Sequence, residues 1–327
     1  MKSVKEVIEL KKLKELKTLM NLFELEIIEN RKNSLIESVS SYLKNNIRSI
    51  LVDFATYDQI NIMSRVCSED YILYENSKLQ NKSIITLEYL GLIYIEKENG
   101  MTRIYIPYDL KNEIKKYIND ETLIKYCIKR QELLDMFLDI LELYGVFNLD
   151  IIVKYINDYA GEGYRIHQCI KIIHKYNMIH LWYYQNNEST YYNMKIEKNE
   201  LPRRLNKTLK LRYKYYEKYD IKNIINRKTK YEKEIYFILN RYYKNTIQTN
   251  EHIKNIKDMI RIGLSDEEIV NIIMSEIKGL SNLGKRKIQF YLGKMRKEYP
   301  LWGLKGYLLE ELREYGYFIN VFEENQR

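Results

Sequence analysis

One stretch of this 327-residue chain combines positive charge with aromatic rings in a way that suits a nucleic-acid contact. Residues 203 to 233 contain twelve Lys or Arg and three acidic residues, a surplus of nine that equals the formal net charge of the whole chain. Lys and Arg neutralise phosphates, and Tyr rings can stack on unpaired bases. The predicted contacts within it are Arg203, Arg204, Lys207, Lys210, Arg212, Lys214, Tyr215 and Tyr216.

The same composition fits two other interpretations. A solvated helix could turn its tyrosines toward a core while its lysine stems cover apolar surface and keep their ammonium groups in water. An acidic protein surface could also bind such a patch. Lys, Ile, Asn and Tyr are all abundant, as in proteins from AT-rich genomes, so the 32 tyrosines carry less weight than their number suggests. The sequence leaves these alternatives open.

A second informative stretch is LEYLGLIYIEKENGMTRIYIP, residues 87 to 107. A helical pattern there runs into two alternating strands joined by Asn99-Gly100, a pair that suits a type I′ hairpin turn. The pattern predicts a helix followed by a β-hairpin wing, as in a winged-helix module. Lys97 and Arg103 are the predicted phosphate contacts of this wing. The helix itself, 82 to 90, lacks an arginine or an Asn/Gln pair for bidentate base readout, which favours a scaffold or protein-interaction role for it.

The pattern of helix followed by hairpin recurs between residues 131 and 196. Helices are predicted at 133–144, stopped by Gly145, at 146–160 and at 164–176, followed by two strands around a polar turn at 186–188. From Lys207 onward the pattern is helical to the end. There Ser265 and Glu268 form a predicted capping box, in which each side chain bonds the other residue's backbone N–H.

The first residues carry another two-helix pattern. Residues 10 to 44 predict a short helix with Leu10, Leu13, Leu16 and Leu19 on adjoining faces, a loop, and a second helix that opens near Ser34. This pattern resembles the helix-loop-helix of the Rho termination factor N-terminus and the SAP domain. In those modules a basic position opens the second helix, and Arg31 and Lys32 hold that place here. The resemblance implies nucleic-acid contact, with a plain helical hairpin as the alternative.

Composition indicates a mostly α protein, because three prolines and twelve glycines leave long uninterrupted stretches. We therefore expect a mostly α fold with small β-hairpins, in which tandem winged-helix-like units precede a C-terminal helical domain. The expected segments are a helix-loop-helix at 1–46, winged-helix-like units at 47–125 and 126–200, and a basic linker helix with the helical domain at 201–327. No segment approaches the ~20 apolar residues of a membrane span, no signal peptide is evident, and three scattered cysteines suit a reducing compartment. The expected location is cytoplasmic.

The densest set of possible metal ligands is His167, Cys169, His174 and His180. On one helix His167 and His174 would lie about 10 Å apart along the axis, with Cys169 pointing elsewhere, so we expect no metal site and no cofactor. Phosphate-binding glycine loops and nucleophile elbows are missing from the sequence, which predicts a protein without enzymatic activity.

Several motifs in the same order resemble a loosely defined group of Firmicute proteins that often carry a SEC-C zinc motif. These are YLGLIYI with its wing, LDILELYGVFNLDII, and the terminal RKEYPLWGLKGYLLEEL. The resemblance implies a shared architecture, but the terminal cysteine pair that would bind zinc is absent here. Taken together, the sequence predicts a non-enzymatic nucleic-acid-binding or regulatory factor for DNA or RNA. The alternative is an adaptor whose winged-helix-like modules bind an acidic protein partner.

Overall fold

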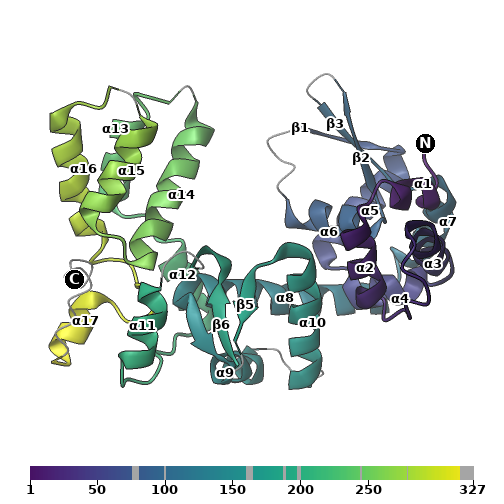
Figure 1. Ribbon diagram of the computed structural model, residues 1–327, viewed down its shortest axis with the longest axis horizontal. Coiled ribbons are helices and arrows are strands. Elements are labelled where there is room, and N and C mark those ends of the chain that lie inside the picture. Colours follow the sequence, from purple (N-terminus) through teal and green to yellow (C-terminus); the bar gives the residue numbers. More distant parts are fainter. Residues whose placement is uncertain are drawn as a thin grey trace. The chain divides into compact units, whose positions relative to one another are not determined.

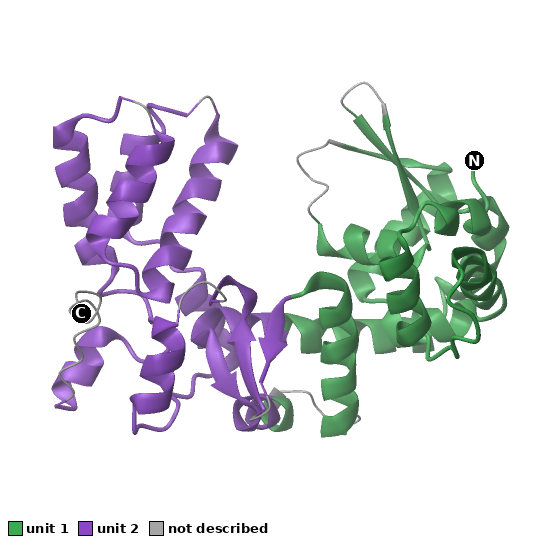
Figure 2. Ribbon diagram, viewed as in Figure 1, with its two compact units in different colours: residues 1–135, 156–181 green, residues 136–155, 182–327 purple. Residues whose placement is uncertain are grey.

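A computed structural model describes residues 1–75, 81–98, 101–159, 165–186, 189–196, 200–243, 245–277 and 279–316. The described chain is mostly helical and contains two small antiparallel sheets of three strands each (Figure 1). This confirms the expected class of a mostly α protein with small hairpins. The chain divides into two compact units (Figure 2), of which unit 1 is Met1–Asp135 with Ile156–Leu181 and unit 2 is Met136–Tyr155 with Trp182–Arg327. The four-segment division expected from the sequence stays a prediction.

Unit 1 consists of helices and one three-stranded sheet. Its helices are α1 (Val4–Glu9), α2 (Leu13–Leu22), α3 (Lys32–Asn45), α4 (Ile47–Phe54), α5 (Tyr57–Glu69), α6 (Lys82–Leu90), α7 (Tyr108–Tyr117), the first part of α8 (Glu121–Tyr144), the end of α9 (Leu149–Tyr159) and α10 (Ile166–His180). Its strands are β1 (Ile72–Glu75), β2 (Tyr94–Glu98) and β3 (Met101–Tyr105).

The predicted N-terminal pair of helices is present as α2 and α3. Helix α2 buries Leu16 and Leu19, but Leu13 at its start and Leu10, the C-cap residue of α1, are exposed, so the apolar face predicted there was too wide. Helix α3 begins at Lys32, two residues earlier than expected, with Arg31 as its N-cap residue. Both helices contribute to a continuous apolar core that runs through unit 1.

The sheet of unit 1 contains the predicted hairpin. Strands β2 and β3 pair antiparallel, and β1 joins the other side of β3, which gives the order β1-β3-β2. Figure 1 shows the hairpin extending away from the helices of unit 1. Inward positions such as Ile72 and Ile104 are buried, as the period of two predicts. The predicted turn residues, Asn99 and Gly100, lie outside the described residues.

Unit 2 begins with the end of α8 and the start of α9. Its further elements are β4 (Val146–Asn148), β5 (Tyr183–Gln185), β6 (Thr190–Asn193), a 3₁₀ turn (Met194–Ile196), α11 (Leu201–Thr208), α12 (Lys218–Ile225), α13 (Lys230–Leu239), α14 (Thr246–Ile262), α15 (Asp266–Glu276), α16 (Asn282–Met295) and α17 (Leu309–Glu314). Strand order is β4-β6-β5, the same pattern as in unit 1. Of the turn predicted at 186–188, Asn187 and Glu188 lie outside the described residues.

Two sequence predictions in unit 2 were wrong. Residues 146–148, predicted to open a helix, form β4 instead, because Gly145 at φ +63° turns the chain and its carbonyl accepts from the N–H of Asn193, the last residue of β6. Residues 209 to 217, predicted to be helical, separate α11 from α12 without a helix. Hydrogen bonds from side chains distant in sequence to the backbone of this segment take the place of helical hydrogen bonds there.

Four helices of unit 2 form a bundle. Helix α13 packs on α14 and α16, and α15 packs on the same two helices, which encloses an apolar core. The capping box predicted at Ser265 and Glu268 is confirmed at the start of α15. The second predicted module, 131–196, is distributed over both units, since residues 131–135 and 156–181 belong to unit 1 and its three strands belong to unit 2.

Candidate nucleic-acid interface

The predicted basic segment contains a non-helical stretch, residues 209 to 216, that we call the strap. Burial alternates along its first half: Leu209 is buried and Leu211 packs on the bundle core, whereas Lys210 and Arg212 are exposed. Alternation with a period of two is characteristic of an extended chain. The apolar side chains of the strap therefore pack on the bundle core of unit 2, and its cations point to solvent.

Two buried tyrosines of unit 2 hold the strap by its backbone. The hydroxyl groups of Tyr144 and Tyr155 lie 3.0 Å apart, and Tyr144 donates to the carbonyl of Lys214 at 2.7 Å. Tyr155 donates to the carbonyl of Tyr216 at 3.1 Å, and the N–H of Tyr216 lies 3.3 Å from the same hydroxyl. Burial raises the pKa of Tyr144 above its usual range, so this hydroxyl stays protonated and remains a donor.

A loop near the C-terminal end of the described chain completes the anchorage. Lys305 donates from Nζ to the carbonyls of Leu209 and Leu211 at 2.6 and 3.1 Å, and its own carbonyl accepts from the N–H of Lys214 at 2.8 Å. Burial lowers the pKa of Lys305. The neighbouring Trp302 is fully buried and donates from Nε1 to the carbonyl of Glu142.

Helix α11, directly before the strap, is fixed on the sheet of unit 2. The guanidinium of Arg203 lies 4.7 and 4.8 Å from the ring centroids of Tyr184 and Tyr192, which are themselves stacked. Asn206 donates to the carbonyl of Val146 at 3.0 Å and contacts the hydroxyl of Tyr213. Arg203 is thus a packing residue of the sheet, unlike the exposed cations of the predicted contact.

The remaining predicted cations differ in their surroundings. Arg204, Lys207, Lys210 and Arg212 are exposed. Lys214 instead bonds Glu311 at 2.5 Å. Burial lowers the pKa of Lys214, but hydrogen bonds to Glu311 and Tyr216 outweigh that effect and leave it raised. The exposed surface of this region therefore concentrates positive charge on α11 and the outward side of the strap.

The predicted stacking residues are used for packing. The ring of Tyr215 lies 4.7 Å from that of Tyr155 and has the Nζ of Lys154 3.7 Å from its centroid. Tyr216 donates to the carbonyl of Gly306 at 2.7 Å. Tyr213, packed edge-on against Tyr144, has its pKa raised to about 12 by burial. The interpretation in which the tyrosines cover a core describes these three rings, although the segment is a strap rather than a helix.

The predicted contacts in unit 1 do not form one surface. In the register of the hairpin Lys97 lies opposite Thr102 and Arg103 lies opposite Glu96. Because adjacent residues of a strand point to opposite faces, the side chains of Lys97 and Arg103 lie on opposite faces of the hairpin. Arg103 stands 5.4 Å from the ring centroid of Tyr71. Lys32 donates to the carbonyl of Glu9 at 3.0 Å and thereby caps the C-terminal end of α1. Arg31 is exposed beside it.

Helix α6, the predicted recognition helix, turns its short polar side chains inward. Ser83 and Thr86 are buried, and the hydroxyl of Thr86 lies 2.7 Å from Nε2 of His180. Its exposed positions include Lys82, Ile85 and Glu88. This set offers no bidentate base contact, in line with a scaffold role for α6.

The His/Cys set of α10 is spread over different environments. His167 and His174 are exposed, Cys169 is buried, and His180 contacts Thr86. Burial raises the pKa of Cys169 to about 11, which disfavours the thiolate that a metal requires. Among the described residues no group of three or more His, Cys, Asp or Glu could hold a metal ion. Nor is any described helix long and apolar enough to cross a membrane.

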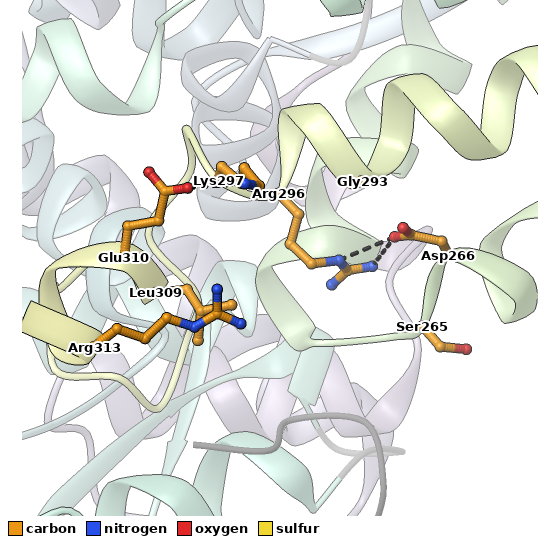
Figure 3. Close-up of a pocket in the computed structure, with 8 residues that line it drawn as sticks. All are labelled: Ser265, Asp266, Gly293, Arg296, Lys297, Leu309, Glu310 and Arg313. Atoms are coloured by element: carbon orange, nitrogen blue, oxygen red, sulfur yellow. Dashed lines mark hydrogen bonds and ion pairs between the residues drawn. The ribbon is translucent and has the colours of Figure 1, made fainter. Parts of the chain in front are cut away.

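Unit 2 also contains a cavity of about 250 Å³ between the start of α15, the end of α16 and α17 (Figure 3). Arg296 projects into this region and bonds Asp266 through Nε and Nη2 at 3.0 and 2.6 Å. Lys297 pairs with Glu310 at 3.0 Å. Arg296 and Lys297 are thus each paired with a carboxylate of the cavity, and with Arg313 in the same lining the formal net charge there is +1.

Sequence reasoning missed the residues that anchor the strap. Tyr144, Tyr155 and Lys305 are far from residues 209 to 216 in sequence, and no local periodicity links them. The available signal was in the terminal WGLKG stretch, where Gly303 and Gly306 both adopt positive φ. A Cβ on Gly303 would lie 2.5 Å from the carbonyl oxygen of Pro202, so this loop depends on close backbone approach.

Comparison with known proteins identified no relative of this chain. No family model matches the chain, and neither a curated protein nor a solved structure matches it. The resemblances to the SEC-C-associated group and to the Rho and SAP modules therefore stay predictions.

Proposed function

We propose that this protein is a non-enzymatic nucleic-acid-binding or regulatory factor of the cytoplasm that contacts phosphates through α11 and the strap. The observation that carries the proposal is the alternation of packed and exposed side chains along residues 209 to 216. Leu209, Leu211 and Tyr213 face the unit, while Lys210 and Arg212 are exposed next to the exposed cations of α11. A backbone held by Tyr144, Tyr155 and Lys305 keeps these charges in place before a ligand arrives.

The test is the salt dependence of binding to a labelled oligonucleotide. In the variant R204Q/K207Q/K210Q/R212Q the log-log slope of affinity against salt should flatten, by about 0.7 to 0.9 for each lost phosphate contact. The matched control, K14Q/K115Q, removes exposed lysines of unit 1 and should leave the slope nearly unchanged. A slope in the quadruple variant equal to that of the wild type excludes this surface as the phosphate contact.

We also propose that α6 with β2 and β3 is a winged-helix-like module, and that residues 126–200 contain a second winged-helix-like unit, whose strands β4, β5 and β6 lie in unit 2. The support is the strand order, in which a strand preceding the helix pairs with the second strand of the following hairpin in both sheets. A limited proteolysis fragment that retains cooperative unfolding would test the first module.

One observation favours the adaptor alternative. The outer face of the sheet in unit 1 exposes Tyr71, Leu73 and Met101, which are apolar side chains more typical of a protein contact than of a phosphate contact. If the purified protein shifts neither DNA nor RNA at low salt but binds an acidic protein, the adaptor function replaces the first proposal.

A further inference from the structure

Helices α13 and α16 of unit 2 pack side by side, and each carries exposed cations and an exposed phenylalanine. On α16 the exposed positions Leu283, Arg286, Lys287 and Phe290 follow a helical spacing of three or four residues. On α13 the positions Lys230, Lys233, Phe237 and, just beyond its end, Arg241 do the same. Each helix thus presents one phenylalanine with cations above and below it.

The two phenylalanines are unusually accessible for rings in a packed bundle. Phe237 is 62% exposed and Phe290 is 59% exposed, whereas the core side of the same helices buries Ile235, Leu239, Ile288 and Leu292. Tyr231 and Tyr291, whose ring centroids lie 6.4 Å apart, contact each other across the helix pair. The ring of Phe290 lies 5.5 Å from that of Tyr291, so a chain of three rings runs from Phe290 on α16 to Tyr231 on α13, and Phe237 adjoins Tyr236 further along α13.

The charge of this surface is strongly one-sided. Residues 282 to 295 contain Lys285, Arg286, Lys287 and Lys294 and no acidic residue. Lys294 stands 5.5 Å from the ring centroid of Phe290, and Lys230 stands 5.0 Å from that of Tyr231. On α13 the acidic residues are Glu232, which is buried and bonded to Tyr299, and the exposed Glu234. A second copy of this surface would be repelled, and a polyanion would be attracted.

We infer that the α13–α16 surface binds single-stranded nucleic acid, with Phe237 and Phe290 stacking on bases and Lys233, Arg241, Arg286 and Lys287 contacting phosphates. Exposed flat rings flanked by cations suit an unpaired strand, whose bases offer free π-faces. A duplex or an acidic peptide would use the cations alone. The inference rests on the proposed nucleic-acid function and specifies the strand type and a second contact region for it.

The experiment compares three full-length proteins, wild type, F237A/F290A and R286Q/K287Q, on a single-stranded oligonucleotide, the matching duplex and polyglutamate. Wild type should prefer the single strand at equal salt. F237A/F290A should lose on the order of tenfold or more in single-strand affinity, with duplex affinity unchanged, because stacking contributes about 1 to 3 kcal/mol per base. R286Q/K287Q should flatten the salt slope by about 0.7 for each lost contact. Y126A, which removes another exposed ring, is the matched control and should bind as wild type does.

The outcomes separate the two claims. If wild type binds no nucleic acid, the proposed function and this inference both fail. If wild type binds but F237A/F290A, with an unchanged melting temperature, binds the single strand equally well, only this inference fails. Equal affinity of the wild type for strand and duplex, or tighter binding of polyglutamate than of the oligonucleotide, also overturns it.

Discussion

The two small sheets of this protein share one strand order but differ in what surrounds them. Each contains a stacked cross-strand tyrosine pair, Tyr94 with Tyr105 in unit 1 and Tyr184 with Tyr192 in unit 2, with ring centroids 5.1 Å apart in both. A cation from outside the sheet adjoins each pair: Lys2 stands over Tyr94, and Arg203 stands over Tyr184 and Tyr192. The local construction is therefore the same.

The difference lies in exposure. In unit 1 the outer face leaves Leu73 50% and Met101 40% exposed. In unit 2 the sheet is covered on both faces, since Phe137 packs on Phe147 and Tyr191 from one side while Trp302 and Arg203 lie on the other. One strand order thus gives a sheet with an exposed apolar face in unit 1 and an internal support for α11 and the strap in unit 2.

The largest expected effect separates these two sheets. Phe147→Lys places an ammonium group at a fully buried position of the unit 2 sheet and should prevent that unit from folding, since an unpaired buried charge costs several kcal/mol. Leu73→Lys, at an exposed position of the unit 1 sheet, should change stability by about 0.5 kcal/mol or less. Hydrogen exchange of peptides from each unit measures both. Similar losses in the two variants would contradict the contrast between the sheets.

A smaller effect tests the covering of the second sheet by the C-terminal loop. A Cβ at Gly145, where φ is +63°, would lie 2.2 Å from the ring of Trp302, so Gly145→Ala should destabilise unit 2 by about 3 kcal/mol. Gly279→Ala is the control, because φ is also positive but no atom lies within 4 Å of the added Cβ. It should cost about 1 kcal/mol. Equal melting temperatures for the two variants would contradict a steric clash between the added Cβ and the ring of Trp302.

The anchorage of the strap predicts an effect of intermediate size. Tyr144→Phe removes the donor to the carbonyl of Lys214 and should cost about 1 to 2 kcal/mol, with faster hydrogen exchange in residues 209 to 216. Tyr155→Phe should act in the same direction, and the two losses should not add, because the hydroxyls contact each other. Additive losses would mean that the hydroxyls act independently.

The smallest effect concerns pH and unit 1. Burial lowers the pKa of His180 to about 4 from an ordinary 6.5. Between these values the unfolded chain binds more protons, so unit 1 gains stability as pH rises and loses it as pH falls from 6.5. Between pH 6.5 and 5.5 the wild type should lose about 1 kcal/mol more than His180→Gln. Urea midpoints followed by hydrogen exchange in unit 1 provide the measurement, and parallel pH profiles would contradict it.

The sequence predicted local features well and long-range ones poorly. The α6–β2–β3 hairpin and the capping box at Ser265 follow from residues within a few positions of one another. The strap does not, because its extended form depends on hydroxyls at Tyr144 and Tyr155 and on Lys305, which lies more than 90 residues away. The basic composition of 203–233 was visible, but which tyrosines pack and which cations are exposed follows only from these distant partners.

The basic face of α16 was also missed, for a different reason. Its KRK run sits in an ordinary amphipathic pattern, and nothing in the pattern shows that Phe290 lies on the exposed side with Arg286 and Lys287. The packing of α13 against α16 determines which side of α16 is buried and which side, with Phe290, is exposed.

Photo-crosslinking of the full-length protein to a single-stranded oligonucleotide, followed by peptide mapping, tests the central claim most directly. The claim is that unit 2, rather than the β2–β3 hairpin of unit 1, makes the phosphate contacts. The account predicts crosslinks in residues 201 to 217 and on α13 and α16, lost progressively as salt rises. Crosslinks concentrated on β2 and β3 around Lys97 and Arg103, or at Arg31 and Lys32, with the strap unlabelled, would contradict it.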